Sequence, residues 1–298
     1  MITRFPLVSV VTPSLNQAGF IKATIDSVLA QDYQPIEVVI VDGQSTDGTL
    51  AILQGYGDRV RWVSGPDAGQ TPAINKGFQM ATGEIIGWLN ADDLYLPGAV
   101  ARAVAFLKNH PSVDLVYGDA DHIDEDGRVI EPYPTEPFRW QRLHETCFIC
   151  QPAVFFRRRV FDVVGFLDER LNCSMDYDYW IRIAQRGVVG YIPERLAQSR
   201  LHAGAKTLRL RVEHQRTSIE IVKRHFDTVP ASWLCAYATA VVERWVPRRT
   251  VWQKRCFAWL VTVVSTWESL RINRGLPRGA LSEWRRWIRR ASAAGRTR

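Results

Sequence analysis

The chain has 298 residues, of which 46% are hydrophobic, and this suits one large globular domain or two modest ones. Its five cysteines, an odd number at scattered positions, argue against the disulfide framework of a small secreted protein. Cys147 and Cys150 form one CxxC pair, but a zinc site would need a second pair, which the sequence lacks. The net charge of +7 is unevenly divided: residues 1–200 carry −7 and residues 201–298 carry +14. We therefore expect two regions with different physical roles.

The first two thirds of the chain alternate short apolar runs with segments of helical periodicity. Strands are predicted at residues 7–12, 36–41, 61–64, 85–89, 114–119 and 151–156. Helices are predicted at residues 21–31, 50–56, 73–80, 97–108 and 157–164, and between the N-cap Ser174 and the stop residue Gly187. This alternation indicates βαβ units, and therefore an α/β fold with a mostly parallel sheet flanked by helices.

Four polar loops follow the carboxyl ends of predicted strands. They are residues 13–16, 42–47, 67 and 90–93. Ligands of open α/β sheets bind just beyond this edge, so we expect the four loops to converge on one site. The adjacent acids Asp92 and Asp93 suit a hard divalent cation such as Mg²⁺ or Mn²⁺, although a solvated turn would explain the same pair. No GxGxxG motif follows the first strand, which argues against a nicotinamide or flavin enzyme.

The loops and their neighbours also form a recognisable set of motifs. These are VSVVTPSLN at residues 8–16, VDGQSTDGT at 41–49, NKG at 75–77 with ATGE at 81–84, and NADD at 90–93. In order and spacing, over roughly residues 5–205, they resemble the family 2 glycosyltransferases, of the bacterial cell-surface polysaccharide type. The resemblance implies a Rossmann-like GT-A fold and a nucleotide-sugar donor.

The resemblance also implies roles for individual residues in the donor site. Pro13 and Asn16 would lie beside the nucleotide base and ribose, and Asp42 would accept a hydrogen bond from the base. Asp67 would lie beside the nucleotide and Lys76 near the phosphates of the donor.

The NADD motif matches the DxD motif of the family with one departure. Asp92 matches the last Asp of that motif and would bind the metal, while Asn90 stands where the first Asp is common. Asn90 and Ala91 would belong to the nucleotide-sugar site, with the Asn90 amide accepting a hydrogen bond from ribose. In the family a histidine after the base helix can approach the metal or the diphosphate, so the resemblance implies that His202 would be a second metal ligand. An ordinary surface or core histidine is the alternative.

A second acidic segment opens the helix predicted after Ser174. Asp176 and Asp178 lie two residues apart, about 200° around a helix, so they cannot both face one cleft. Asp178 can pair with Arg182 four residues later, and both acids could simply complement the helix dipole. The resemblance assigns Asp176 as the catalytic base, with Met175 where another acid usually precedes it.

The C-terminal region from residue 208 differs in composition, with seven of the eleven tryptophans interleaved with arginine. Helices are predicted at residues 212–226, 233–245 and 249–274, and Trp252, Trp259 and Trp267 share one helical face. The uncharged stretch 256–267 has twelve residues, short of the roughly 20 that span a bilayer. We expect a membrane-surface contact through residues 249–291, attracted by anionic headgroups. Packing on the protein or on another subunit is the main alternative, and nucleic-acid binding is least favoured.

Together these observations predict two regions. Residues 1–207 would form the GT-A domain, with a nucleotide-sugar half at about 1–125 and an acceptor half at about 126–207. Residues 208–298 would form a basic helical region. The N-terminus shows no charged-then-apolar signal layout, so we expect a cytoplasmic protein, peripheral on the inner face of the plasma membrane.

The predicted function is that of an inverting, metal-dependent glycosyltransferase. It would move a sugar from a nucleotide-diphosphate donor, with UDP as the default, to a hydroxyl of a glycan or lipid-linked acceptor in cell-envelope polysaccharide synthesis. A sugar-phosphate nucleotidyltransferase is one alternative, but it would want a basic glycine-rich loop where residues 13–16 stand. A non-catalytic membrane scaffold with a degenerate transferase domain is another, and intact Asp42, Asp92 and Asp176 argue against it.

Overall fold

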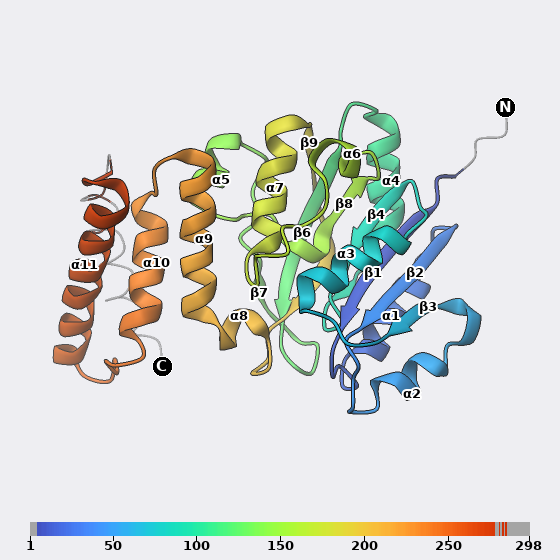
Figure 1. The fold of residues 1–298 in the computed structure, drawn as a ribbon, viewed down its shortest axis with the longest axis horizontal. Helices are drawn as coiled ribbons and strands as arrows, with labels where there is room; N and C mark the ends of the chain where they lie inside the picture. The colour runs from blue at the N-terminus through green and yellow to red at the C-terminus, as the bar shows by residue number, and fades with distance from the viewer. Residues whose placement is uncertain (1–4, 278–279, 281, 283, 285–298) are drawn as a thin grey trace. The chain divides into compact units, whose positions relative to one another are not determined.

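The computed structural model of the protein describes residues 5–277, 280, 282 and 284. Contacts divide the chain into two compact units. Unit 1 comprises Met1–Arg139 and Phe148–Ala205, and unit 2 comprises Trp140–Cys147 and Lys206–Arg298. Unit 1 holds the whole described sheet, whereas the described part of unit 2 is helical (Figure 1).

Unit 1 is built on one nine-stranded sheet. Its strands are β1 (Val8–Ser14), β2 (Ile36–Asp42), β3 (Arg61–Ser64), β4 (Ile85–Trp88), β5 (Leu94–Tyr95), β6 (Leu115–Ile123), β7 (Val129–Pro132), β8 (Val154–Arg157) and β9 (Val189–Arg200). Their order is β3-β2-β1-β4-β8-β6-β9-β5, with β7 paired to β6. The sheet is parallel from β3 through β4 and mixed beyond, since β8 runs antiparallel to both of its neighbours. The predicted α/β class is thus confirmed, and its parallel part is the half that carries the four predicted loops.

Helices cover both faces of the sheet. They are α1 (Ile21–Leu29), α2 (Thr49–Gln54), α3 (Gln70–Met80), α4 (Ala99–Asn109), α6 (Val160–Val164) and α7 (Met175–Arg186). Alternate residues of a strand point to opposite faces, so Val8 and Val10 pack in one core cluster with α1 and α4. Val11 points the other way, toward α3, where a Cβ on Gly77 would lie 2.3 Å from its side chain. Gly77 therefore permits α3 to approach the sheet closely.

The strand order places the topological switch point of the sheet between β1 and β4. The chain passes from β1 through α1 to β2 on one side, and returns through α3 to β4 on the other. At such a switch point the flanking loops diverge, and this is where open α/β sheets bind ligands. The loops that follow β1 and β4 are residues 15–20 and 89–93. The second contains the predicted loop 90–93, and the first contains only residues 15 and 16 of the predicted loop 13–16, because Pro13 and Ser14 belong to β1.

The sequence analysis predicts no strand over residues 189–200, yet β9 forms there. Gly190 and Pro193 weaken any strand signal, because proline cannot donate to a β ladder. The structure accommodates Pro193 in an irregularity: the pairing with β6 jumps from Gly118–Ile192 to Asp119–Arg195. Pro193 and Glu194 therefore bulge out of the ladder. A second shift, from Asp119–Arg195 to Ala120–Ala197, skips Leu196, and the strand then continues to Arg200, next to the predicted site.

Unit 2 contains α5 (Trp140–Glu145), α8 (Lys206–Arg209), α9 (Arg211–Phe226), α10 (Ala231–Val242) and α11 (Val251–Asn273). α10 lies between α9 and α11 and packs against both (Figure 1). Thr250 and Gln253 form a reciprocal capping box that fixes the start of α11. Within the described residues, no helix is both long and apolar enough to cross a membrane.

Candidate active site

The loops after β1 and β2 are tied together by a short relay of hydrogen bonds. The backbone N–H of Asn16 donates to Ser45 Oγ at 2.8 Å, and Ser45 Oγ in turn donates to Asp42. Asn16 Oδ1 accepts from the backbone N–H of Thr46 at 2.8 Å. Asn16 is a non-glycine residue with φ of 53°, a left-handed conformation that this set of bonds holds in place. Asn16 and Asp42, two of the residues predicted to bind the nucleotide-sugar donor, are thus linked in one hydrogen-bond network.

Asp42 is only 1% exposed and serves as the centre of that network. Its carboxylate accepts hydrogen bonds from Ser45 N at 2.9 Å and from Ser64 Oγ at 2.8 Å, which also anchors the end of β3. Asp67 lies against the same loop, because a Cβ on Gly43 would come within 2.6 Å of Asp67 Oδ2. The ends of β1, β2 and β3 therefore meet, as the sequence predicts.

The other predicted donor residues are differently placed. Pro13 is buried within β1, where it pairs with Val41, whereas Asn16 and Asp67 are exposed. Lys76 is exposed on α3, about 9 Å along the helix axis from its first residue, Gln70.

The loop after β4 is held from several sides. The Asn90 side chain accepts from Trp88 Nε1 at 3.2 Å and donates to Gln151 Oε1 at 2.7 Å. Thr24 of α1 donates to the carbonyls of Ala91 and Asp93, both at 2.9 Å. The amide of Asn90 is therefore committed to the protein, and it shapes the loop that presents Asp92.

Asp92 and His202 form the most chemically distinctive pair of the site. His202 Nε2 lies 2.9 Å from Asp92 Oδ2, and the two side chains are 10% and 21% exposed. The His202 ring packs on Phe20, with ring centroids 4.8 Å apart. Residues 110 positions apart in the chain thus meet at one point, because β9 ends beside the loop after β4.

Asp93 has a different role from Asp92. It is buried and accepts a hydrogen bond from the backbone N–H of Arg200 at 2.9 Å. Burial raises the pKa of Asp93 well above its usual value, and the charge of Asp92 raises it further. Asp93 and Arg200 therefore connect the β4 loop to β9, and Asp92 is the acid left at the surface.

The residues present fit a divalent cation of the kind that uses few protein ligands. Among the described residues, no group of three or more His, Cys, Asp or Glu side chains is arranged to hold a metal ion. Asp92 and His202 supply two adjacent donors, an oxygen and a nitrogen. Mg²⁺ and Mn²⁺ sites commonly take one or two protein groups and complete their coordination with water and substrate phosphates.

Asp176 and Asp178 are separated by their environment as well as by angle. Asp178 is 1% exposed and pairs with Arg182 at 2.8 Å, which confirms the predicted pairing. Asp176 is half-buried in the first turn of α7, after Ser174, whose φ of 55° is left-handed. Asp178 is therefore a buried acid paired with Arg182, whereas the candidate base Asp176 is half-buried at the start of α7.

α3 holds the segment that leads into α7. The Asn75 side chain bonds both the N–H and the carbonyl of Leu167 at 3.0 Å, and its amide also donates to Glu169 at 2.9 Å. Thr71 donates to the carbonyl of Leu171 at 2.7 Å. These bonds fix the path of the chain just before Asp176.

Sequence reasoning missed the residues that hold the site together. They are Ser45, Asn75, Gln151 and Arg200, all side chains whose partners lie far along the chain. Ser45 and Asn75 stand inside the motifs quoted above, which is the signal that could have indicated them. Arg200, which donates to the carbonyl of Asp92 at 2.9 Å, carries no such signal.

A protein-family model matches the half of the chain that carries the four predicted loops. Residues 9–165 match the model described as "Glycosyl transferase family 2". The chain belongs to this family. The family assignment made from the motifs is therefore confirmed, and the matched segment includes the loops after β1, β2, β3 and β4.

Relatives of the family 2 chain are found among curated proteins. A protein of Rickettsia felis named "Uncharacterized glycosyltransferase" is 30% identical over 278 residues, which cover 84% of this chain. A "PGL/p-HBAD biosynthesis glycosyltransferase" of Mycobacterium bovis is 36% identical over 188 residues, 59% of this chain and 69% of that protein. The chain spans only 44% of the length of the Rickettsia felis relative.

Solved structures share the GT-A fold of this family 2 chain. The crystal structure of S. aureus TarS 1-349 in complex with UDP-GlcNAc matches with a TM-score of 0.59 at 16% identity, covering 97% of this chain and 91% of that one. The mannosyltransferase PcManGT from Pyrobaculum calidifontis, in complex with GDP-Man and Mn²⁺, matches with a TM-score of 0.60 at 18% identity, covering 98% and 87%. At these identities the likeness shows the fold alone.

Proposed function

We propose that this chain transfers a sugar from a nucleotide-diphosphate donor to a hydroxyl of an acceptor, with inversion at the anomeric carbon. The observation that carries the proposal is the Asp92–His202 pair, which lies at the carboxyl end of β4, beside the switch point of a family 2 domain. The solved neighbours that hold UDP-GlcNAc and GDP-Man support a nucleotide-sugar donor.

In this proposal the loops after β1, β2 and β3 bind the nucleotide. Pro13 and Asn16 lie beside the base and ribose, and Asp42 accepts a hydrogen bond from the base. In this structure Asp42 is 1% exposed and its carboxylate is held by Ser45 and Ser64. Asp67, Asn90 and Ala91 complete the nucleotide-sugar site, and Lys76 serves the phosphates.

Asp92 and His202 would hold a divalent ion, and the Mn²⁺ in the PcManGT complex supports Mn²⁺ as well as Mg²⁺. Such an ion neutralises the charge that develops as the nucleotide diphosphate leaves. Arg200 and Thr24 keep the β4 loop in place, so Asp92 is presented without rearrangement.

Asp176 is the proposed general base. It takes the proton from the acceptor hydroxyl as that oxygen bonds to the anomeric carbon, and the bond from this carbon to the diphosphate oxygen breaks. One displacement inverts the anomeric centre, so a single base suffices. General-base assistance typically contributes about 10²–10⁴-fold in rate.

The acceptor and the location are the remaining parts of the proposal. We infer a glycan or lipid-linked acceptor of the cell envelope, which the name of the Mycobacterium bovis relative supports. UDP-sugars are the first donors to test, followed by GDP- and dTDP-sugars. The proposal places the chain in the cytoplasm, in contact with the membrane surface through part of residues 249–291.

The base assignment is tested by steady-state kinetics on Asp176→Asn, with the donor panel and release of nucleotide diphosphate as the readout. Turnover should fall by about 10²–10⁴-fold, because the amide cannot accept the proton, while the dissociation constant of the donor stays near that of the wild type. Near-normal turnover would remove Asp176 from the mechanism. Failure of the wild type to bind any nucleotide sugar would instead favour the scaffold alternative.

A further inference from the structure

The outward face of α11 is unusually apolar. Its exposed residues are Val251, Trp252, Arg255, Trp259, Val263, Trp267, Leu270 and Arg271, and Arg274 follows at the end of the helix. The side chains of Trp252, Trp259 and Trp267 are 79%, 64% and 66% exposed. They lie seven and eight residues apart, so they share one side of the helix.

The inward face of α11 is apolar as well. Phe257 and Val261 pack against Ala238 and Val242 of α10, and Leu260 and Val264 pack at the edge of this cluster. A surface helix of a globular protein normally has a polar outward face opposite such an inward face. The apolar outward face of α11 therefore points to a covering surface on the tryptophan side.

The described part of the chain does not supply that cover. Ala280 and Trp284 could have packed on α11, but they pack instead against Ala231 and Cys235 of α10. Trp284 is only 6% exposed, so its side chain does not take part in the membrane contact expected of residues 249–291. A contiguous exposed apolar patch of this kind marks an interaction surface.

The charges on this face favour one occupant. Every charged residue among the exposed positions is an arginine, namely Arg255, Arg271 and Arg274. A second copy packed face to face would bring identical arginines together, because a two-fold interface pairs the same patch with itself. An anionic lipid surface offers opposite charge, and tryptophans with basic neighbours are typical of helices that lie in the interface.

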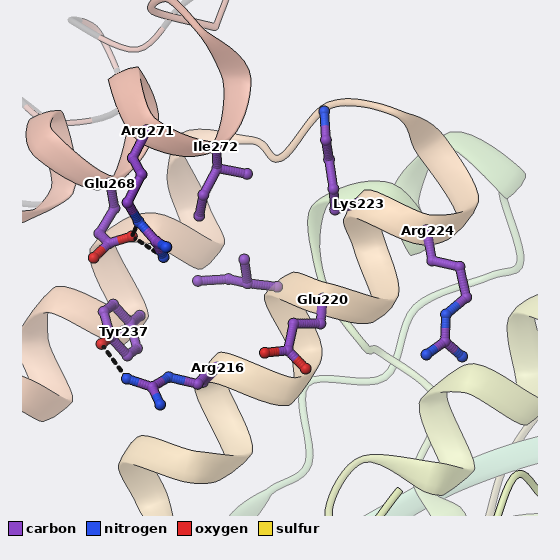
Figure 2. Close-up of a pocket in the computed structure, with 9 residues that line it drawn as sticks. Arg216, Glu220, Lys223, Arg224, Tyr237, Glu268, Arg271 and Ile272 are labelled. Atoms are coloured by element: carbon purple, nitrogen blue, oxygen red, sulfur yellow. Dashed lines mark hydrogen bonds and ion pairs between the residues drawn. The ribbon is translucent and has the colours of Figure 1, made fainter. Parts of the chain in front are cut away.

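A positively charged hollow borders the same face. A cavity of about 610 Å³ lies among α9, α10 and α11, with Arg216, Lys223 and Arg224 on one wall and Arg271 on the other (Figure 2). Two acids, Glu220 and Glu268, offset only part of this charge. Arg271 follows Trp267 by four residues, so the two side chains are neighbours on the helix surface. Arg271 is paired with Glu268 at 2.7 Å, so the positive charge of the hollow comes mainly from Arg216, Lys223 and Arg224 of α9.

We propose that α11 lies in the plane of an anionic membrane surface, with Trp252, Trp259 and Trp267 at the boundary of the acyl chains and the arginines among the headgroups. The helix acts as a docking element for a lipid surface. The inference is independent of the donor chemistry, because no residue of unit 1 contributes to it.

The experiment is flotation of the full chain with vesicles of phosphatidylcholine alone and of phosphatidylcholine mixed with phosphatidylglycerol. The wild type should float with the anionic vesicles and much less with the neutral ones. Arg255→Gln with Arg274→Gln should weaken anionic binding by roughly 30-fold, since each basic residue near the surface contributes about a factor of five. Added salt should weaken the wild type in the same direction.

A triple variant tests the aromatic face directly. Changing Trp252, Trp259 and Trp267 to Ser should lower binding to anionic vesicles by at least about 100-fold, because their apolar area no longer enters the interface. A control with Val129, Ile130 and Val188 changed to Ser removes exposed apolar side chains of unit 1 and should float like the wild type. Circular dichroism verifies that each variant is folded.

Two results would overturn the proposal. The first is equal flotation of the wild type and the tryptophan variant. The second is a wild type that does not float but forms an oligomer in light scattering, which the tryptophan variant dissociates. That result would assign the face to a second copy of the chain.

Discussion

Asp176 and Asp178 show how two identical side chains, two residues apart, acquire different roles. Asp178 is enclosed and bonded to Arg182, which also donates to the carbonyls of Val164 and Phe166. Asp176 is half-buried one position into α7. The depth of burial, rather than residue type, separates the structural acid from the candidate base.

This separation predicts a contrast between matched variants. Asp178→Asn should lower the free energy of unfolding by roughly 1–3 kcal/mol, because the buried ion pair with Arg182 is lost. Asp176→Asn should lower the free energy of unfolding by less than Asp178→Asn does, because Asp176 is only half-buried. Urea unfolding of both variants measures the difference. Equal stability of the two variants would contradict the assignment.

Ser45 gives a second prediction at the level of one side chain. It accepts from the N–H of Asn16 and donates to Asp42, so Ser45→Ala breaks the link between the β1 and β2 loops. Donor affinity should fall by about 10-fold, equivalent to one hydrogen bond, as measured by calorimetric titration. Ser232→Ala, which loses a bond to the carbonyl of Glu145 in unit 2, is the control and should bind donor normally. An unchanged affinity in Ser45→Ala would show that the relay does not shape the donor site.

Among the helices, α3 positions the segment that leads into α7. Asn75 bonds Leu167 and Glu169, and through them it fixes the chain that enters α7 and Asp176. Asn75→Ala should reduce turnover by about 10-fold with little change in the donor dissociation constant, because the donor loops are untouched. Gln79→Ala, on an exposed position of the same helix, should behave as the wild type. A normal turnover number for Asn75→Ala would contradict this positioning role.

The elements also show how far the sequence could lead. β3, β2, β1 and β4 could each be predicted from an apolar run bounded by turn residues. The polar residues at the carboxyl ends of these strands correctly indicated that the loops after β1, β2 and β3 meet. β9 was missed because Gly190 and Pro193 oppose a strand locally, and only pairing with β6 overrides them. The contact between Asp92 and His202 depends on β9, so the resemblance could suggest it but periodicity could not.

At the scale of the whole molecule, the charge asymmetry coincides with two kinds of surface. The acidic first 200 residues contain the sheet and most of the candidate site, with His202 just beyond them, and the described part of the basic remainder is mainly helical with an outward tryptophan face on α11. The sequence predicted that these tryptophans share a face. It could not predict that this face points outward, because the alternative of inward packing has the same periodicity.

The central claim is that a divalent ion held by Asp92 and His202 binds the nucleotide-sugar donor, and donor titration tests it most directly. UDP-, GDP- and dTDP-sugars are titrated calorimetrically into the wild type and into Asp92→Ala. Each titration is done once in the presence of Mn²⁺ and once in the presence of EDTA. The account predicts that one donor class binds the wild type only with Mn²⁺, and that Asp92→Ala loses this binding while remaining folded. Equal donor affinity with Mn²⁺ and with EDTA, or undiminished metal-dependent binding by Asp92→Ala, would contradict it.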